Sequence, residues 1–209
     1  MAQSATRSGT PQTAAAGFSF VELVVSLCLM LVLTAIAIPS LTRSLRSYQL
    51  NDAAGRVSDM LKFTRFEAVR RNTQLNLQVT QTATGWIVWT DSYAVGNGGP
   101  ARPTDKQDLL AGFATLLPAG SPVPSANAIS AGLGNATLTP LSGTNSSITF
   151  DARGAIRTGI GGTVSNSVFV FYIGNANDPD PGYRAVVLLP SGSTQIWTAP
   201  SGGPWRQVG

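Results

Sequence analysis

The side chain with the clearest potential for chemistry is Glu22, a carboxylate near the start of an otherwise uncharged apolar run at residues 18–38. A charged side chain at the middle of a bilayer costs about 2.5–3.5 kcal/mol on insertion scales, and less near the interface. Glu22 therefore either lies at the headgroup level or has a cationic partner. Cleavage after Gly17 would create such a partner, because the new α-amino group of Phe18 would lie one helical turn from Glu22. That amine could pair with Glu22 of the same chain or of a packed neighbour.

Other reactive groups are scarce. The chain of 209 residues has no histidine and one cysteine. Without histidine, His-dependent triads and His-containing zinc sites are excluded. Cys28 lies in the apolar run, where it is typical of a small hydrophobic side chain, and a single cysteine cannot form an intramolecular disulfide. We therefore expect no enzymatic activity, no cofactor and no metal site.

The apolar run is long enough to cross a membrane. It holds 21 residues, and a helix that rises about 1.5 Å per residue needs roughly 20 to span the hydrocarbon core. Small residues precede the run at 14–17, whereas an ordinary secretory signal has its cleavage site after the apolar region. Arg43 and Arg46 follow the span and only Arg7 precedes it, so the positive-inside rule alone would place the C-terminal side in the cytoplasm.

A polar leader that ends in Gly17, then Phe18, then Glu22 four residues later in an apolar helix, resembles the signal of type IV pilins and type II secretion pseudopilins. The resemblance implies that prepilin peptidase cleaves between Gly17 and Phe18 on the cytoplasmic side and methylates the Phe18 amine. It also implies that Glu22 guides the subunit into a filament by neutralising a neighbour's N-terminal amine. Pro39 matches a helix-kinking proline common in these proteins. We follow this resemblance over the charge bias, and expect a single-pass protein of the inner membrane with its C-terminal head in the periplasm.

A second helical pattern follows the span. Between residues 40 and 71 Gly55 is the only Gly or Pro, and apolar residues recur every three or four positions, as on one face of an amphipathic helix. This face comprises Leu50, Ala53, Ala54, Val57, Met60, Leu61, Ala68 and Val69. Charged residues take the other positions, which favours a solvated face with ion pairs between adjacent turns over a nucleic-acid surface. We expect Asn72 to cap the helix, which together with the span would cover about 54 residues.

The rest of the chain has the pattern of antiparallel strands. Alternating or continuous apolar segments predict strands at residues 75–79, 86–89, 147–151, 168–173, 183–189 and 194–197. The first two form a predicted hairpin, and Gly154 and Gly192 are expected in turns that require a positive φ. Residues 91–147 are rich in Gly, Ala, Pro, Ser and Asn, and give weak strand signals at 109–117 and 136–141 among long loops.

The C-terminal third carries a narrower resemblance. The segments ITFDARGAI at 148–156 and YRAVVLLPSGSTQIW at 183–197 resemble the C-terminal module of H-type pseudopilins and of the fimbrial-T and fimbrial-U minor pilins. That family includes subunits implicated in DNA uptake, which carry closely spaced arginines in the final hairpin. Here the matching stretch has no Arg or Lys, and Arg184 and Arg206 are isolated. Binding of nucleic acid requires several cations that contact phosphates together, so nucleic acid is disfavoured as a partner.

An oxygen-rich segment at residues 175–182 has two possible interpretations. Asn175, Asn177, Asp178 and Asp180 are hard oxygen donors that could hold Ca²⁺. The spacing is not that of an EF-hand loop, however, and two prolines favour a rigid acidic turn.

Together these features predict an α+β fold in which a long N-terminal transmembrane and amphipathic helix packs on a C-terminal antiparallel β-sheet head. The expected divisions are a leader at 1–17, a span at 18–39, an amphipathic helix at 40–72 and a β-rich head at 73–209. The expected function is that of a minor pseudopilin or minor pilin in type II protein secretion or type IV pilus assembly. The alternative is a pilus-associated DNA-binding minor pilin for natural transformation. Expected partners are other pilins or pseudopilins, prepilin peptidase, the inner-membrane assembly platform and membrane lipid.

Overall fold

The computed structural model describes residues 19–91, 104–118, 120–141 and 145–208. In these residues the elements are α1 (Phe20–Arg71), β1 (Leu75–Thr82), β2 (Gly85–Asp91), β3 (Gln107–Ala111), β4 (Thr115–Leu116), α2 (Asn127–Gly132), β5 (Leu138–Pro140), β6 (Asn145–Phe150), β7 (Ile156–Arg157), β8 (Val168–Gly174), β9 (Tyr183–Leu188), β10 (Thr194–Ala199) and β11 (Arg206–Val208). The chain divides into two units, Met1–Leu41 and Thr42–Gly209.

The described part of the first unit is the N-terminal portion of α1. Its side chains are exposed throughout, and within the described ranges α1 is the one helix long and apolar enough to cross a membrane. The hydroxyl of Thr34 donates to the carbonyl of Met30 at 2.6 Å, so this polar group is satisfied within the helix, as apolar surroundings require. Pro39 lies inside α1, although proline has no N–H to donate to the carbonyl four residues earlier.

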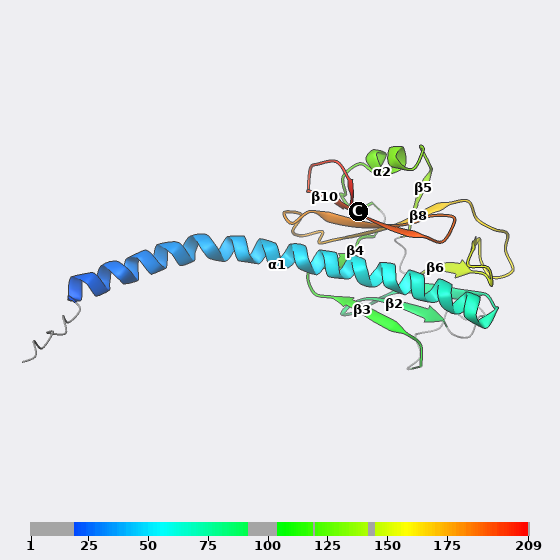
Figure 1. The fold of residues 1–209 in the computed structure, drawn as a ribbon, viewed down its shortest axis with the longest axis horizontal. Helices are drawn as coiled ribbons and strands as arrows, with labels where there is room; N and C mark the ends of the chain where they lie inside the picture. The colour runs from blue at the N-terminus through cyan, green and yellow to red at the C-terminus, as the bar shows by residue number, and fades with distance from the viewer. Residues whose placement is uncertain (1–18, 92–103, 119, 142–144, 209) are drawn as a thin grey trace, which may run out of the picture. The chain divides into compact units, whose positions relative to one another are not determined.

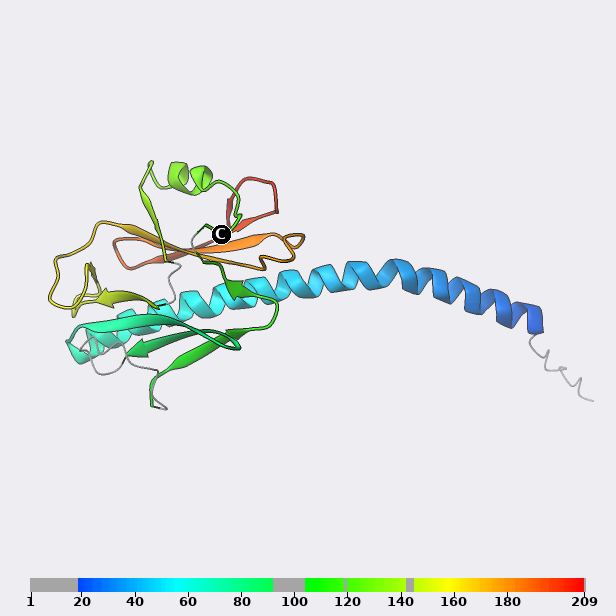
Figure 2. The same cartoon turned by 180° about the vertical axis from the view of Figure 1, so that it is seen from behind.

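The second unit contains two β-sheets (Figure 1; Figure 2). One has the strand order β3-β2-β1-β6-β7, and the other has the order β11-β10-β9-β8-β4 with β5 added beside β8. The predicted hairpin is β1–β2, with Val79 opposite Val88. Among the described residues, all strand pairs are antiparallel except β5 with β8. The predicted antiparallel head is confirmed, and its strands form two sheets, because β6 pairs with β1 and not with β8.

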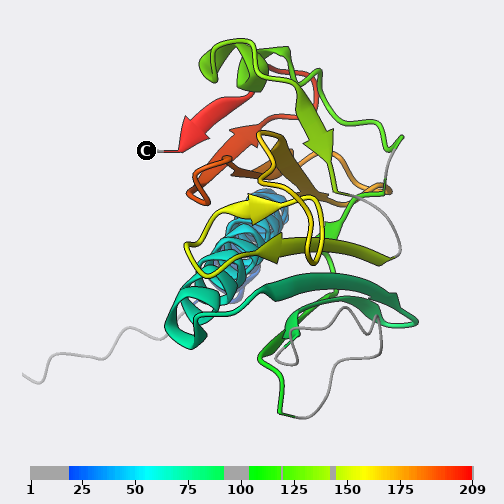
Figure 3. The same cartoon turned by 90° about the vertical axis from the view of Figure 1, so that its right-hand side faces the viewer.

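The second half of α1 packs against both sheets, one on either side of it when the helix is viewed end-on (Figure 3). The buried apolar side chains of this half are Leu50, Ala53, Ala54, Val57, Met60, Leu61 and Ala68. They contribute to one core with Phe150 of β6 and Phe171 of β8, both fully buried. Complete burial of such a side chain stabilises the fold by about 1.5–3 kcal/mol. The predicted face is confirmed except at Val69, which is 47% exposed.

The sheet that contains β9 is covered on both faces. A second core, which includes Ile129 of α2 and Trp205, lies on the face opposite to α1. All six residues of β9 are therefore buried, which explains its nearly continuous apolar sequence. Within residues 91–147, strand β5 coincides with the weak strand signal at 136–141, whereas the helix α2 was expected to be loop.

The end of α1 agrees with the expected cap. Asn72 has a φ of +52°, the left-handed conformation that ends many helices. The N–H of Thr73 then donates to the carbonyl of Ala68 at 3.1 Å, and the N–H of Asn72 donates to the carbonyl of Val69 at 3.1 Å. These bonds satisfy carbonyl groups that the helix leaves without an intrahelical partner.

Candidate functional site

Glu22 lies in the first turn of α1 and is exposed. It is the one acidic residue in the first unit, and the N-terminal end of a helix favours a negative charge. The apolar residues around it are exposed as well, with Phe20 at 80%. A continuous apolar surface of this kind is covered in a working protein by lipid or by other helices. Gly17 and Phe18 lie outside the described residues, so the pairing of the Phe18 amine with Glu22 stays a prediction.

Two arginines that follow the span contact the oxygen-rich turn between β8 and β9. The Nε of Arg43 lies 2.9 Å from a carboxylate oxygen of Asp180, and Arg46 pairs with Asp178. The guanidinium of Arg46 also lies 5.2 Å from the centre of the Phe113 ring. Pairs as exposed as these contribute about 0–1 kcal/mol each, so their main effect is to orient the turn against α1. The two carboxylates of this segment thus face cations of the chain itself.

Arg184 is buried, with 6% of its surface exposed. Its guanidinium donates to Asn51 Oδ1 at 2.6 Å, to Ser47 Oγ at 2.9 Å and to the carbonyl of Tyr183 at 3.0 Å. Burial lowers the pKa of Arg184. Because Ser47 and Asn51 lie one turn apart on α1, they present two acceptors to one planar guanidinium.

The structure separates Arg184 and Arg206, the two isolated cations near the last hairpin, by their exposure to solvent. Arg184 joins β9 to α1 and does not face solvent, whereas Arg206 is exposed. A nucleic acid could reach only the second of these residues. This difference weakens further the DNA-binding alternative.

Two pairs of hydroxyl groups join α1 to the sheets on its two sides. Ser58 Oγ lies 2.8 Å from Thr194 Oγ1 of β10, and Thr64 Oγ1 lies 2.7 Å from Thr90 Oγ1 of β2. Thr64 also donates to the carbonyl of Met60 at 2.8 Å. Buried hydroxyls without partners would destabilise the core, so these pairs select one register of the helix against the strands.

The last turns of α1 contain a carboxylate, Glu67, that was expected on the solvated face of the helix. Glu67 is only 6% exposed, and its carboxylate accepts from Arg70 at 2.8 and 2.5 Å and from Arg71 Nε at 2.6 Å. The hydrogen bond from Arg70 chiefly lowers the pKa of Glu67 to about 2, against the opposing effect of burial. The predicted ion pairs are confirmed here, but the position of Glu67 at the solvent is wrong.

Arg65 lies between the two turns that the sequence predicted at glycines. Its Nε donates to the carbonyl of Gly154 at 3.0 Å. Gly154 has a φ of +75° and Gly192 a φ of +78°, so both predictions of a positive φ are confirmed. A Cβ atom at Gly192 would lie 2.6 Å from Arg65 Nε, which shows how closely this turn approaches α1.

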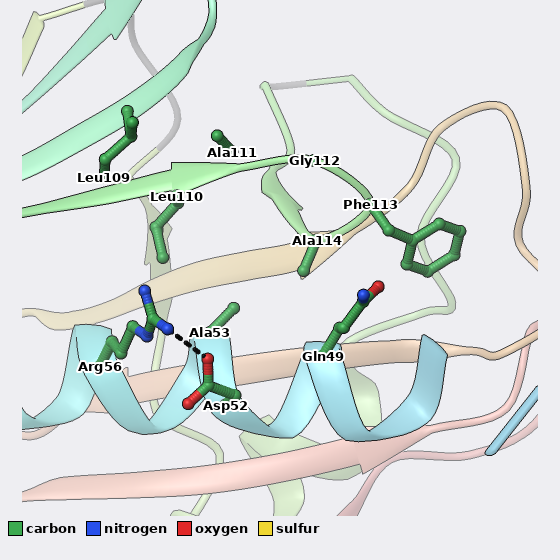
Figure 4. A pocket seen from close by; sticks show the side chains of 10 residues that line it. All are labelled: Gln49, Asp52, Ala53, Arg56, Leu109, Leu110, Ala111, Gly112, Phe113 and Ala114. Atoms are coloured by element: carbon green, nitrogen blue, oxygen red, sulfur yellow. Dashed lines mark ion pairs between the residues drawn. The ribbon is translucent and has the colours of Figure 1, made fainter. Parts of the chain in front are cut away.

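A small cavity of about 210 Å³ lies between α1 and the segment at residues 109–114 (Figure 4). The side chains of Gln49 and Arg56 point from α1 toward that segment. Arg56 pairs with Asp52 at 2.8 Å and with Asp108 at 3.9 Å. Among the described residues no three His, Cys, Asp or Glu side chains form a group that could hold a metal ion.

A larger groove of about 590 Å³ is lined by residues nearer the C-terminal end of α1, and we call it the α1 groove. Its lining residues are Lys62, Arg65, Phe66 and Val69 of α1, Arg153 of the β6–β7 turn, and Gly192, Ser193 and Thr194 of the β9–β10 turn.

Comparisons with known proteins give two similarities. The protein family described as "Type II transport protein GspH" matches residues 53–192. Among solved structures, the crystal structure of the type IV minor pilin FimU of Pseudomonas aeruginosa is similar, with 19% identity, coverage of 75% of this chain and 93% of that chain, and a TM-score of 0.46. No curated protein matches the chain.

Proposed function

Because this chain belongs to the Type II transport protein GspH family, we propose that it is a minor pseudopilin or minor pilin, a non-enzymatic structural subunit of a filament. The family match over residues 53–192, more than half of the chain, carries this proposal. The filament serves either type II protein secretion or type IV pilus assembly. The helix α1 supports a single-pass anchor, because it is long and apolar enough to cross a membrane.

In this proposal prepilin peptidase cleaves the chain between Gly17 and Phe18 and methylates the new Phe18 amine. The processed subunit stays in the inner membrane through α1, with the head in the periplasm. The apolar surface of residues 20–41, now facing lipid, becomes the surface that packs against other subunits in the filament. The assembly platform in the inner membrane receives the subunit before it enters the filament.

Glu22 favours the movement of the subunit from the lipid bilayer into the filament. A carboxylate in a bilayer costs about 2.5–3.5 kcal/mol near the centre, and an opposite charge in the same surroundings offsets that cost. The Phe18 amine of a neighbouring subunit is such a charge, and the filament brings it close to Glu22. The unpaired state in the membrane is thereby less stable than the paired state in the filament.

The second half of α1 holds the head in one orientation on its own helix. Its apolar face is buried against both sheets, and Arg184 and the two hydroxyl pairs add directional bonds. A head fixed in this way adopts a defined position when the helix packs in a filament. This is the property that a structural subunit requires.

The experiment that tests the proposal is the intact mass and the N-terminal sequence of the full chain, expressed with and without an active prepilin peptidase. The expected result is a chain that starts at N-methylated Phe18 when the peptidase is present and at Met1 when it is absent. A chain that remains uncut beside an active peptidase, which still processes a known prepilin in the same cells, would overturn the proposed processing and the roles of Phe18 and Glu22.

A further inference from the structure

The α1 groove exposes a large apolar surface on the second unit. Phe66 is 64% exposed and Val69 is 47% exposed, and both lie on α1 within the groove. Gly192 and Ser193 of the β9–β10 turn line the same groove. An exposed phenyl ring that lines a groove leaves apolar area that a bound side chain would remove from water, at about 25 cal/mol per Å².

Cations surround this apolar surface. Lys62, Arg65 and Arg153 all line the groove. Lys62 has Asp59 at 3.3 Å, but neither Arg65 nor Arg153 forms an ion pair with a carboxylate of the described ranges. The Nε of Arg65 donates to Gly154, which leaves the two terminal amino groups of the guanidinium for an acceptor. The groove therefore carries positive charge that the surrounding fold does not balance.

The ten acidic side chains of this sequence are poor candidates for the missing negative charge. The chain has 10 acidic residues, and all of them lie in the described ranges, so the remaining segments contain none. Glu22 is in the apolar span, and each of the other nine already contacts a partner within the second unit. A second copy of the chain has its acidic residues in the same pairs, so it is also a poor source of carboxylates for the groove.

We propose that the α1 groove binds a segment of a different protein in which a large apolar side chain is flanked by carboxylates. The apolar side chain packs on Phe66 and Val69. The carboxylates accept hydrogen bonds from Arg153 and from the terminal amino groups of Arg65, for which a guanidinium is well shaped. This inference concerns the second unit alone, and it holds whether or not the N-terminus is processed.

The test uses the full chain in detergent and a random peptide library displayed on phage as the probe. We expect the selected peptides to be enriched in Asp or Glu next to Phe, Leu or Trp. The most enriched peptide is then labelled, and its affinity for the full chain is measured by fluorescence anisotropy. Phe66→Ala should weaken binding about tenfold, as for an aromatic anchor. Arg153→Gln should weaken it about threefold, with a reduced dependence on salt.

Arg206→Gln is the matched control, because it removes one exposed positive charge outside the groove and should leave the affinity unchanged. Circular dichroism of each variant checks that the fold is retained, and the exposure of Phe66 and Arg153 makes that outcome the expected one. Selected peptides without acidic residues, or with an affinity that neither groove variant changes, would overturn the inference.

Two other results would also overturn it by assigning the groove to a different occupant. Binding of a labelled single-stranded oligothymidylate that is lost in Arg153→Gln would assign the cations to nucleic acid. Self-association of the full chain that is lost in Phe66→Ala, measured by analytical ultracentrifugation in density-matched detergent, would assign the groove to a second copy.

Discussion

The guanidinium Nε of Arg184 lies 2.6 Å from Oδ1 of Asn51, a residue 133 positions away in the sequence. This contact joins β9, the fully buried strand of its sheet, to the helix that carries the anchor. A second amino group of the same guanidinium binds Ser47, so one side chain holds two consecutive turns of α1. This contact between β9 and α1 depends on the planar guanidinium group of arginine, which donates several hydrogen bonds in fixed directions. The single ammonium group of lysine does not reproduce this arrangement of donors.

Arg184→Lys should therefore lower the free energy of unfolding of the second unit by about 1–3 kcal/mol, because a buried hydrogen-bond acceptor on α1 loses its partner. Urea unfolding of the full chain in detergent, followed by tryptophan fluorescence, measures this change. Arg206→Lys is the control, and as an exposed substitution it should change stability by less than about 0.5 kcal/mol. Equal stability of the two variants would contradict the assigned role of Arg184.

Gly192→Ala should lower the free energy of unfolding by about 2–4 kcal/mol, because it combines a strained backbone with a close contact. Gly192 has a φ of +78°, and its added Cβ would lie 2.7 Å from the carbonyl oxygen of Gly154. Gly134→Ala separates the two causes, since Gly134 has a φ of +68° but no atom within 4 Å of the added Cβ. Only the backbone strain of about 1 kcal/mol applies there. Similar losses in both variants would show that the contact with the turn is unimportant.

The stability of the second unit should fall when the pH drops from about 4.5 toward 2. The pKa of Glu67 is lowered from its ordinary value of 4.5 to about 2, so the folded state keeps this carboxylate charged over a range in which the unfolded chain binds a proton. The stabilisation is complete above the higher value and disappears as the pH approaches the lower one. Asp151 adds a dependence of the same sign, because hydrogen bonds from two backbone N–H groups and from Arg157 lower its pKa in spite of the opposing burial.

Glu67→Gln isolates the share of Glu67 in this pH dependence. The variant should be less stable than the wild type at neutral pH by about 1–3 kcal/mol, because two arginines lose their charged acceptor. The difference between the two proteins should shrink as the pH falls toward 2. Unfolding by urea at a series of pH values measures both curves. A difference that stays constant over this range would show that Glu67 does not titrate as described.

Glu22→Ala should leave membrane insertion intact and reduce incorporation into filaments by about tenfold or more, because the pairing of opposite charges in apolar surroundings is lost. The ratio of this chain in purified filaments to that in the membrane, measured by quantitative immunoblot, gives the effect. Glu22→Asp keeps the carboxylate and should retain more incorporation than the alanine variant. Wild-type amounts of Glu22→Ala in filaments would remove the assembly role from Glu22.

Local patterns allowed much of this fold to be predicted from the sequence. The period of the apolar residues identified the buried face of α1, and the glycines at 154 and 192 identified two turns with positive φ. Asn72 ends the helix for the same local reason, since asparagine tolerates the left-handed conformation. Each of these features depends on residues that are close in the sequence.

The features that could not be predicted depend on distant residues. Arg184 is buried because Asn51 and Ser47 supply acceptors, and nothing near Arg184 in the sequence indicates them. Strand β5 pairs in parallel with β8, which lies about thirty residues later in the sequence. Parallel strands are not joined by a hairpin turn, so no turn motif predicts this pairing. Val69 continues the apolar period of α1 but is 47% exposed, which the period alone does not indicate.

The two hydroxyl pairs on opposite sides of α1 have a mechanical consequence. A subunit whose helix is anchored and whose head is pulled experiences a load along the helix axis. Ser58 with Thr194, and Thr64 with Thr90, then resist sliding of α1 against β10 and β2. Because both pairs join the same helix to a neighbouring strand, sliding of α1 past the two sheets must break both of them. The head is accordingly built to withstand shear along its own helix.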